Sequence, residues 1–189
     1  MPEVLISILV GIGLAAACGF RVFIPLLVLS IVARTGHLPL SGDFQWLSTT
    51  PALVALACAA ILEAGAYYVP WLDNALDTIA TPAAVLAGVL VTAAVVTDLP
   101  PVLRWGVAVI GGAGMAGTVQ GATVLARLKS SVLTGGVGNP VVSTGETAGS
   151  VTTSVLAVLV PVVAFILVVI LVVSLFVLAR RLARASLDR

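Results

Sequence analysis

The sequence predicts an all-α fold, a polytopic bundle of transmembrane helices, in a single integral membrane domain over residues 1–189. One observation is the uncharged run Val151–Ala179, 29 residues rich in Val, Leu and Ile. A helix of that length reaches about 43 Å, more than the ~30 Å hydrocarbon core of a bilayer. The second is the composition, 60% hydrophobic and 9% charged, with a mean hydropathy of +1.23. Soluble proteins carry about 25% charged residues, so this chain cannot cover a globule in water.

The candidate spans are five apolar blocks, which are Val4–Ala33, Pro51–Val69, Pro82–Val96, Val102–Ala126 and Val151–Ala179. The second and fourth have the ordinary span length of about 20 residues. The third is short unless it extends back to about Thr78. The first and last exceed one straight crossing, and each contains a proline, Pro25 or Pro161, that breaks or kinks a helix. We therefore expect five to seven spans with at least one discontinuous segment.

The distribution of basic residues predicts the orientation of the chain. Residues 180–189 hold four arginines directly after the last block, and such clusters stay on the cytoplasmic side. We expect a multi-pass protein of the cytoplasmic (inner) membrane with a cytoplasmic C-terminus. Strict alternation of five spans would leave Arg127 and Lys129 outside, against the same rule. A break near Pro161 removes that conflict.

Three segments between the blocks differ from ordinary linkers: His37–Thr50, Pro70–Thr81 and the Gly-rich Leu133–Glu146. The second contains Asp73 and Asp77, which share one face if this segment is helical. Two carboxylates on one face repel unless a cation lies between them. The alternative is a solvated loop in which Asp73 caps a helix.

Two charged residues lie inside apolar blocks, Arg21 in the first and Glu63 in the second. An arginine at mid-bilayer costs at least ~2.5–3.5 kcal/mol on insertion scales, so it needs a partner or a water-filled cavity. We predict that Arg21 and Glu63 approach each other or share a polar cavity. Such a pair serves equally as a structural lock or a transport element. Snorkelling of Arg21 to the interface from a break in the helix is the alternative.

Three further polar residues complete the candidate substrate- or ion-binding set. Gln120 lies in the small-residue run Gly111–Gly121, where helices approach closely and amides often join them. Asn139 lies in the Gly-rich segment. Glu146 precedes the last block and suits the positive end of its helix.

Several function classes find no support in the sequence. His37 is the only histidine, and Cys18 and Cys58 lie in apolar runs, so we expect neither a metal site nor a catalytic set, and no enzyme. The glycine runs lack the strand–turn–helix setting of nucleotide motifs, so no cofactor is expected. A net charge of +1 gives no case for a nucleic-acid partner.

The two halves of the chain, 1–98 and 102–189, have similar sequence patterns. The runs Gly13–Ala16 and Gly114–Gly117 are each followed by a polar residue, Arg21 or Gln120. Inverted repeats of this kind build a midplane site in many transporters. We therefore expect two pseudo-repeats.

The runs GLAAACGFRVFIPLLVLSIVARTG, PALVALACAAILEAGAYYVPWLDNALD and TGGVGNPVVSTGE, in this order, resemble an uncharacterised bacterial membrane family, domain of unknown function 4126. The resemblance covers nearly the whole chain and is most specific at the Gly-Asn-Pro segment with its downstream glutamate. Family members often have Asp-Lys where this chain has Tyr67-Tyr68, and Glu-Asp where it has Glu146-Thr147. The resemblance implies a fold but no established activity.

The leading hypothesis is a small transporter, channel or lipid-translocating protein with a polar site between its helices. Its partners would be the lipid bilayer and a small solute, ion or lipid. The sequence leaves open whether the protein forms a homo-oligomer. The alternative is a non-transporting scaffold or accessory subunit with structural charges. A transporter should gather Arg21, Glu63 and the Gly135–Glu146 segment around a cavity, whereas a scaffold should pair the charges directly.

Overall fold

The computed structural model describes residues 2–68 and 70–187, without the side chains of residues 2, 70–77, 175, 178, 179 and 181–187. Within this part the chain is helical, with no strand. The elements in order are α1 (Pro2–Cys18), α2 (Phe23–Arg34), the 3-10 helix η1 (Gly42–Ser48), α3 (Thr50–Ala66), α4 (Pro70–Val95), α5 (Pro101–Val107), the π-helical turn η2 (Ala108–Gly112), α6 (Ala113–Thr134), α7 (Asn139–Leu159) and α8 (Pro161–Leu187). The predicted all-α bundle is confirmed.

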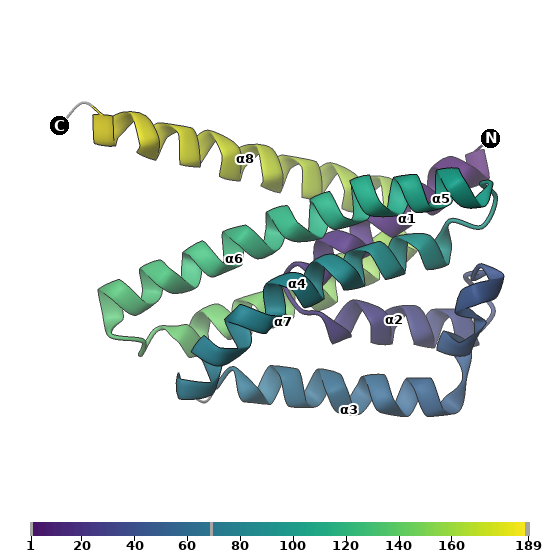
Figure 1. The fold of residues 1–189 in the computed structure, drawn as a ribbon, viewed down its shortest axis with the longest axis horizontal. Coiled ribbons are helices and arrows are strands. Elements are labelled where there is room, and N and C mark those ends of the chain that lie inside the picture. Colours follow the sequence, from purple (N-terminus) through teal and green to yellow (C-terminus); the bar gives the residue numbers. More distant parts are fainter. Residues whose placement is uncertain (1, 69, 188–189) are drawn as a thin grey trace.

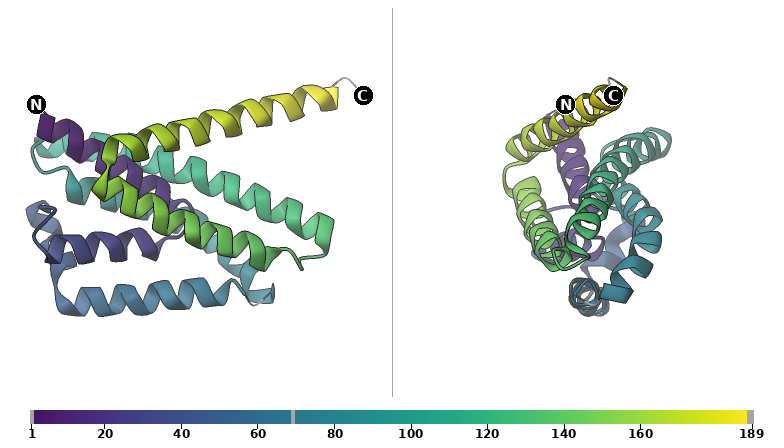
Figure 2. Two further views of the ribbon diagram at one scale, coloured as in Figure 1. Left: turned by 180° about the vertical axis from the view of Figure 1, so that it is seen from behind. Right: turned by 90° about the vertical axis from the view of Figure 1, so that its left-hand side faces the viewer.

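The helices lie roughly along the longest axis of the molecule, around a central α1 (Figure 1). Helix α1 packs against α4, α6, α7 and α8, while α3 lies outside α2. Helices α5, η2 and α6 follow one another as a single long rod. Helix α8 leaves the bundle towards its C-terminal end and diverges from α6 (Figures 1 and 2).

The first apolar block is broken, as predicted. Helix α1 ends at Cys18, and α2 begins at Phe23 and runs back antiparallel to it (Figure 2). Gly19 lies so close to α6 that a Cβ there would be 2.6 Å from the Ala116 carbonyl oxygen. Pro25, in the first turn of α2, has no N–H to continue a helix from the preceding residues. The four residues between the helices form the tip of a hairpin, which includes Arg21.

The last apolar block is also broken, so the run Val151–Ala179 is not one continuous helix. Val160 has φ −140° and ψ 68°, outside the α region, which is disfavoured for the residue before a proline. Helix α8 starts at Pro161 and runs back along the bundle (Figure 2). The C-terminal ends of α6 and α8 therefore lie at the same end of the molecule (Figure 1), which removes the conflict over Arg127 and Lys129.

The Gly-rich segment Leu133–Glu146 is mostly helical, contrary to expectation. Only the turn at residues 135–138 separates α6 from α7, and Gly135 and Gly136 adopt φ values of 62° and 90°. A left-handed glycine at this position ends a helix. Pro140 starts α7, because proline suits a first helical turn. Glu146 thus lies two turns inside α7 instead of at its positive end.

The second unusual segment, Pro70–Thr81, is also not a loop. It forms the first part of α4, which continues through the internal Pro82 to Val95. The third apolar block therefore extends back to Thr78, and Thr78–Val95 is long enough to cross a membrane. In the remaining segment, His37–Thr50, η1 holds the exposed Trp46.

Polar and apolar side chains are distributed in the reverse of the way found in a soluble protein. Large apolar side chains face outwards, for example Ile61 and Leu62 on α3, which are 72% and 71% exposed. The largest fully buried side chain is Arg21, and buried serines lie along α7. A soluble protein rarely exposes such an apolar surface. An apolar exterior around a polar interior is the arrangement required by lipid.

Two helical rods in the described part are long and apolar enough to cross a membrane, at Thr78–Val95 and Pro101–Thr134. A third span results if the bent pair η1 and α3, at 69°, is counted as one. The apolar parts of α1, α2 and α8 are shorter. Of the predicted five to seven spans, two or three thus meet the length of a full crossing. The predicted repeat of the two halves stays a prediction.

Small residues bring α4 and η2 into backbone contact. A Cβ at Gly112 would lie 2.5 Å from the Gly88 carbonyl oxygen and 2.6 Å from Thr92 Oγ1. The Thr92 hydroxyl donates to the Gly88 carbonyl at 2.8 Å. Without a hydrophobic effect between helices in lipid, such close approach supplies packing energy.

We predict that Gly112→Ala lowers the thermal stability of the purified protein in detergent, because the added methyl group forces α4 and η2 apart. Overpacking of this kind costs typically 1–3 kcal/mol. The matched control is Gly114→Ala, where an added Cβ meets nothing within 4 Å; we expect an unchanged or slightly raised stability, since alanine favours helix. Equal melting temperatures for the two variants would contradict the close contact.

Candidate functional site

The site lies where the tip of the α1–α2 hairpin meets α3, α6 and α7. Its centre is Arg21, which is 1% exposed. Nη2 of Arg21 donates to the Ser143 hydroxyl at 2.5 Å and to the Ser143 carbonyl at 3.0 Å. Nε donates to Thr147 Oγ1 at 3.2 Å. The tip of the hairpin is thereby bound to α7.

Glu146 is the carboxylate that joins two arginines. Arg127, on α6, donates through Nε to Glu146 Oε1 at 2.9 Å and through Nη2 to Oε2. Such a two-pronged contact is the strong form of an arginine–carboxylate pair. Nη2 of Arg21 lies 3.5 Å from the same Oε2. Since Glu146 and Arg127 are both 5% exposed, this ion pair is buried, and it connects α6, α7 and the hairpin tip.

Tyr67 connects α3 to the same group. The guanidinium carbons of Arg21 and Arg127 lie 4.1 Å and 3.9 Å from its ring centroid. A buried cation over a tyrosine face is attracted by the ring quadrupole. The next residue, Tyr68, has its hydroxyl 2.9 Å from Thr144 Oγ1 on α7. The end of α3 is thus attached to both arginines and to α7.

Glu63 binds the hairpin through its backbone, not through Arg21. Its two carboxylate oxygens accept hydrogen bonds from the N–H groups of Val22 at 2.7 Å and Phe23 at 3.0 Å. These N–H groups are at the start of α2, where the helix dipole favours a negative charge. Glu63 therefore binds the two residues that follow Arg21, whereas the ion-pair partner of Arg21 in the described part is Glu146.

A cavity of about 250 Å³ borders this group between α6, α7 and α8. Glu146 and Thr123 are its polar residues, and its other lining residues are Phe20, Val119, Ala122, Ala126, Val142, Gly145 and Leu171. The cavity is therefore apolar along most of its wall and reaches a buried charge on one side.

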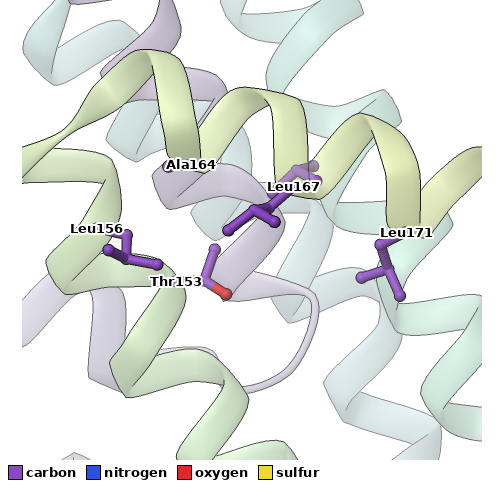
Figure 3. Close-up of a pocket in the computed structure, with 6 residues that line it drawn as sticks. Thr153, Leu156, Ala164, Leu167 and Leu171 are labelled. Atoms are coloured by element: carbon purple, nitrogen blue, oxygen red, sulfur yellow. The ribbon is translucent and has the colours of Figure 1, made fainter.

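A second, smaller cavity of about 110 Å³ lies between α7 and α8. Figure 3 shows Thr153 and Leu156 of α7 opposite Leu167 and Leu171 of α8. Leu171 lines both cavities. The two spaces thus follow the same side of α8, where this helix begins to leave the bundle.

The remaining predicted site residues make other contacts or lie outside the described side chains. Gln120 is buried on α6, and its backbone nitrogen lies against Gly19 at the hairpin tip. Asn139 exchanges hydrogen bonds with Ser131 at 3.0 and 3.4 Å and so links α6 to the start of α7. Asp73 and Asp77 lie in the first part of α4, and their side chains are outside the described residues.

Other members of the site, among them Arg127, Tyr67, Ser143 and Thr147, were not predicted as site residues from the sequence. In the sequence Arg127 directly follows the apolar block Val102–Ala126 and resembles the basic residues that commonly flank a membrane span. The available signal was its 19-residue separation from Glu146 across a glycine turn, which places both residues on adjacent antiparallel helices. Among the described residues no group of three or more His, Cys, Asp or Glu could hold a metal ion.

We predict that Arg127→Leu and Glu146→Leu each destabilise the protein by about 3–5 kcal/mol, because each leaves a buried charge without its partner. The double variant should lose less than the sum, as measured by unfolding in detergent. The matched cycle is Arg21→Leu with Glu63→Leu, which share no ion pair and should couple more weakly. Additive losses at Arg127 and Glu146 would disprove the buried pair.

Comparison with known proteins gives one match. Residues 8–181 match the family described as Domain of unknown function (DUF4126). No curated protein and no solved structure matches the chain. The match covers the hairpin, the site and most of α8, and it confirms the resemblance carried by the three sequence runs. The chain therefore belongs to the DUF4126 family.

Proposed function

We propose that the protein is a small transporter that moves an amphiphilic, lipid-like substrate across the membrane, with no enzymatic activity. The supporting observation is the cavity of about 250 Å³ between α6, α7 and α8, which is apolar but borders the buried carboxylate of Glu146. An apolar pocket with a few convergent polar groups is the usual form of a small-molecule site. Here the apolar wall suits a hydrocarbon chain and the polar side suits a head group.

The position of the cavity favours a substrate that arrives from the lipid. Its walls come from helices with outward-facing apolar side chains, such as Leu125 on α6, 58% exposed, and Ile170 on α8, 55% exposed. Helix α8 also diverges from α6 towards its C-terminal end (Figure 1). An apolar cavity wall next to an apolar exterior suits a hydrocarbon chain that comes from the lipid.

A scaffold without transport is the second candidate, and one observation favours it. The charges at the site are paired directly: Glu146 with both arginines, and Glu63 with the N–H groups of α2. Buried ion pairs of this kind can specify how helices join. The scaffold reading, however, leaves the cavity beside Glu146 without a role.

We predict that the purified protein in liposomes accelerates the exchange of fluorescent lipids between leaflets, measured by quenching of the outer leaflet. Leu171→Trp should slow this exchange at least several-fold, because the indole fills the space where both cavities meet. The matched control is Ile170→Trp, one residue away and facing outwards, which should leave the rate unchanged. Exchange no faster than in protein-free liposomes, with the protein folded, would favour the scaffold.

We further propose that the protein resides in the cytoplasmic membrane of a bacterium, with the shared end of α6 and α8 facing the cytoplasm. Helix α6 carries Lys129 near this end and α8 carries Arg180, Arg181 and Arg184 in its last turns, whereas α2 ends with Arg34 and α5 contains Arg104 at the other end (Figure 1). The excess of basic residues marks the cytoplasmic side.

We predict that single cysteines at Lys129 and Ser186, in a Cys18→Ala, Cys58→Ser background, are both protected from an impermeant thiol reagent in intact cells. A cysteine at Ser48, at the opposite end of the bundle, should be labelled. Labelling of position 186 together with protection of position 48 would reverse the orientation. Different labelling at 129 and 186 would contradict the return of α8 along the bundle.

A further inference from the structure

The guanidinium of Arg21 has one nitrogen that no described residue satisfies. Nη2 and Nε are engaged by Ser143, Glu146 and Thr147, whereas the buried Nη1 has no hydrogen-bond partner among the described residues. An unpaired buried donor is costly, and more so when it is charged. Arg21 can therefore accept one further oxygen ligand at low cost.

Glu146 connects the cavity to Arg21. Glu146 lines the cavity and lies 3.5 Å from Nη2 of Arg21. Phe20, the residue before Arg21, lines the same cavity. If the carboxylate moves aside, Nη1 and Nη2 together present the two-pronged donor set that matches a phosphate or carboxylate.

We propose that Glu146 is an internal counter-ion that occupies the place of an anionic lipid head group, and that the substrate is a lipid whose oxyanion displaces Glu146 from Arg21. This inference rests on the proposed function and names its substrate class. The exchange of one anion for another keeps the arginine compensated throughout, so a buried positive charge is never left alone. The hydrocarbon chain of the lipid occupies the apolar part of the cavity.

The exchange explains why the site combines a tight ion pair with an adjacent space. A lipid oxyanion takes the place of the Glu146 carboxylate at Nη2 of Arg21 and binds Nη1 as well, which has no hydrogen-bond partner among the described residues. Ser143 and Thr147, which also hold Arg21, keep the guanidinium in position while the anions exchange. The ring of Tyr67, 4.1 Å from the guanidinium carbon, supports it from another side.

The test is the binding of defined probes to the full-length protein in neutral detergent, followed by native mass spectrometry. The probes are a short-chain phosphatidic acid, the phosphatidylcholine of the same chain length, and inorganic phosphate. We expect the phosphatidic acid to bind at least ten-fold more tightly than the phosphatidylcholine. Inorganic phosphate should bind more weakly still, because it has no chain to fill the cavity. Equal binding of both lipids, or of inorganic phosphate and phosphatidic acid, would overturn the proposal.

Variants at the two members of the pair should act in opposite directions. Glu146→Gln removes the competing charge and should tighten phosphatidic acid binding several-fold, whereas Arg21→Gln should abolish the preference for it. Arg21→Lys keeps the charge without the two-pronged geometry and should retain only part of the affinity. The matched control is Asp43→Asn, which makes the same change in net charge and also removes a carboxylate that pairs with an arginine, Arg104. The side chain of Asp43 is 72% exposed, so this variant should have no effect.

The outcomes separate this inference from the proposed function. Weaker binding in both Glu146→Gln and Arg21→Gln, with both proteins folded by thermal unfolding, would mean that the pair is only structural and would overturn the inference. Equal tightening in Glu146→Gln and Asp43→Asn would overturn it as well, since it would reflect overall charge. Lipid exchange in liposomes with no head-group preference would support the transport function and refute the counter-ion. The expected binding pattern without any exchange would support the anion site and refute transport.

Discussion

The buried contact of Glu146 with Arg127 and Arg21 is the interaction on which the rest of the structure depends. It joins α6, α7 and the tip of the α1–α2 hairpin, segments that are far apart in the chain. In a bilayer no water can solvate these charges, so they persist only because they satisfy one another. The positions of the three helices follow from that requirement, as does the position of Tyr67, which both guanidinium groups contact.

Glu63 satisfies other polar groups near the same site, the backbone N–H groups at the start of α2. A helix that begins inside an apolar bundle has N–H groups that no earlier turn can satisfy. The two carboxylate oxygens of Glu63 accept from two of them at the start of α2. The hairpin can therefore turn inside the protein, and its tip can hold Arg21 fully buried. A carboxylate at a helix start and a carboxylate between arginines are two ways of keeping a negative charge in low dielectric.

The rest of the bundle is built to let these polar contacts form without competition from bulky side chains. Glycines and alanines allow α4 and η2, and α1 and α7, to approach until backbone atoms touch. Large apolar residues are displaced to the outside, where lipid accepts them. Beside Glu146 this packing leaves a space of about 250 Å³. The proposals for transport and for an anionic substrate both rest on the fact that this space adjoins the charged group.

Much of this architecture was predictable from the sequence, because it depends on local properties. Apolar length and the scarcity of charge determined a membrane helix bundle, and Pro25 and Pro161 marked the two blocks that break. Arg21 and Glu63 were identified as site candidates because a charge in an apolar run always needs compensation. For Pro70–Thr81 the sequence left a helix and a solvated loop open, and Leu133–Glu146 was not expected to be mostly helical, because turn-forming residues and acids also occur in the first turns of helices.

Which carboxylate compensates which arginine was decided only by the tertiary structure. Arg21 had two candidate partners of equal charge, and nothing in their spacing along the chain distinguishes Glu63 from Glu146. The choice depends on where the hairpin tip lies relative to α3 and α7, and on Arg127, which reads in the sequence as an ordinary flanking charge. The cavity beside Glu146 could not be foreseen either. The sequence alone determined that buried charges exist and must be paired, because burial follows from local hydropathy; their pairing depends on distances between helices, which only the packed bundle defines.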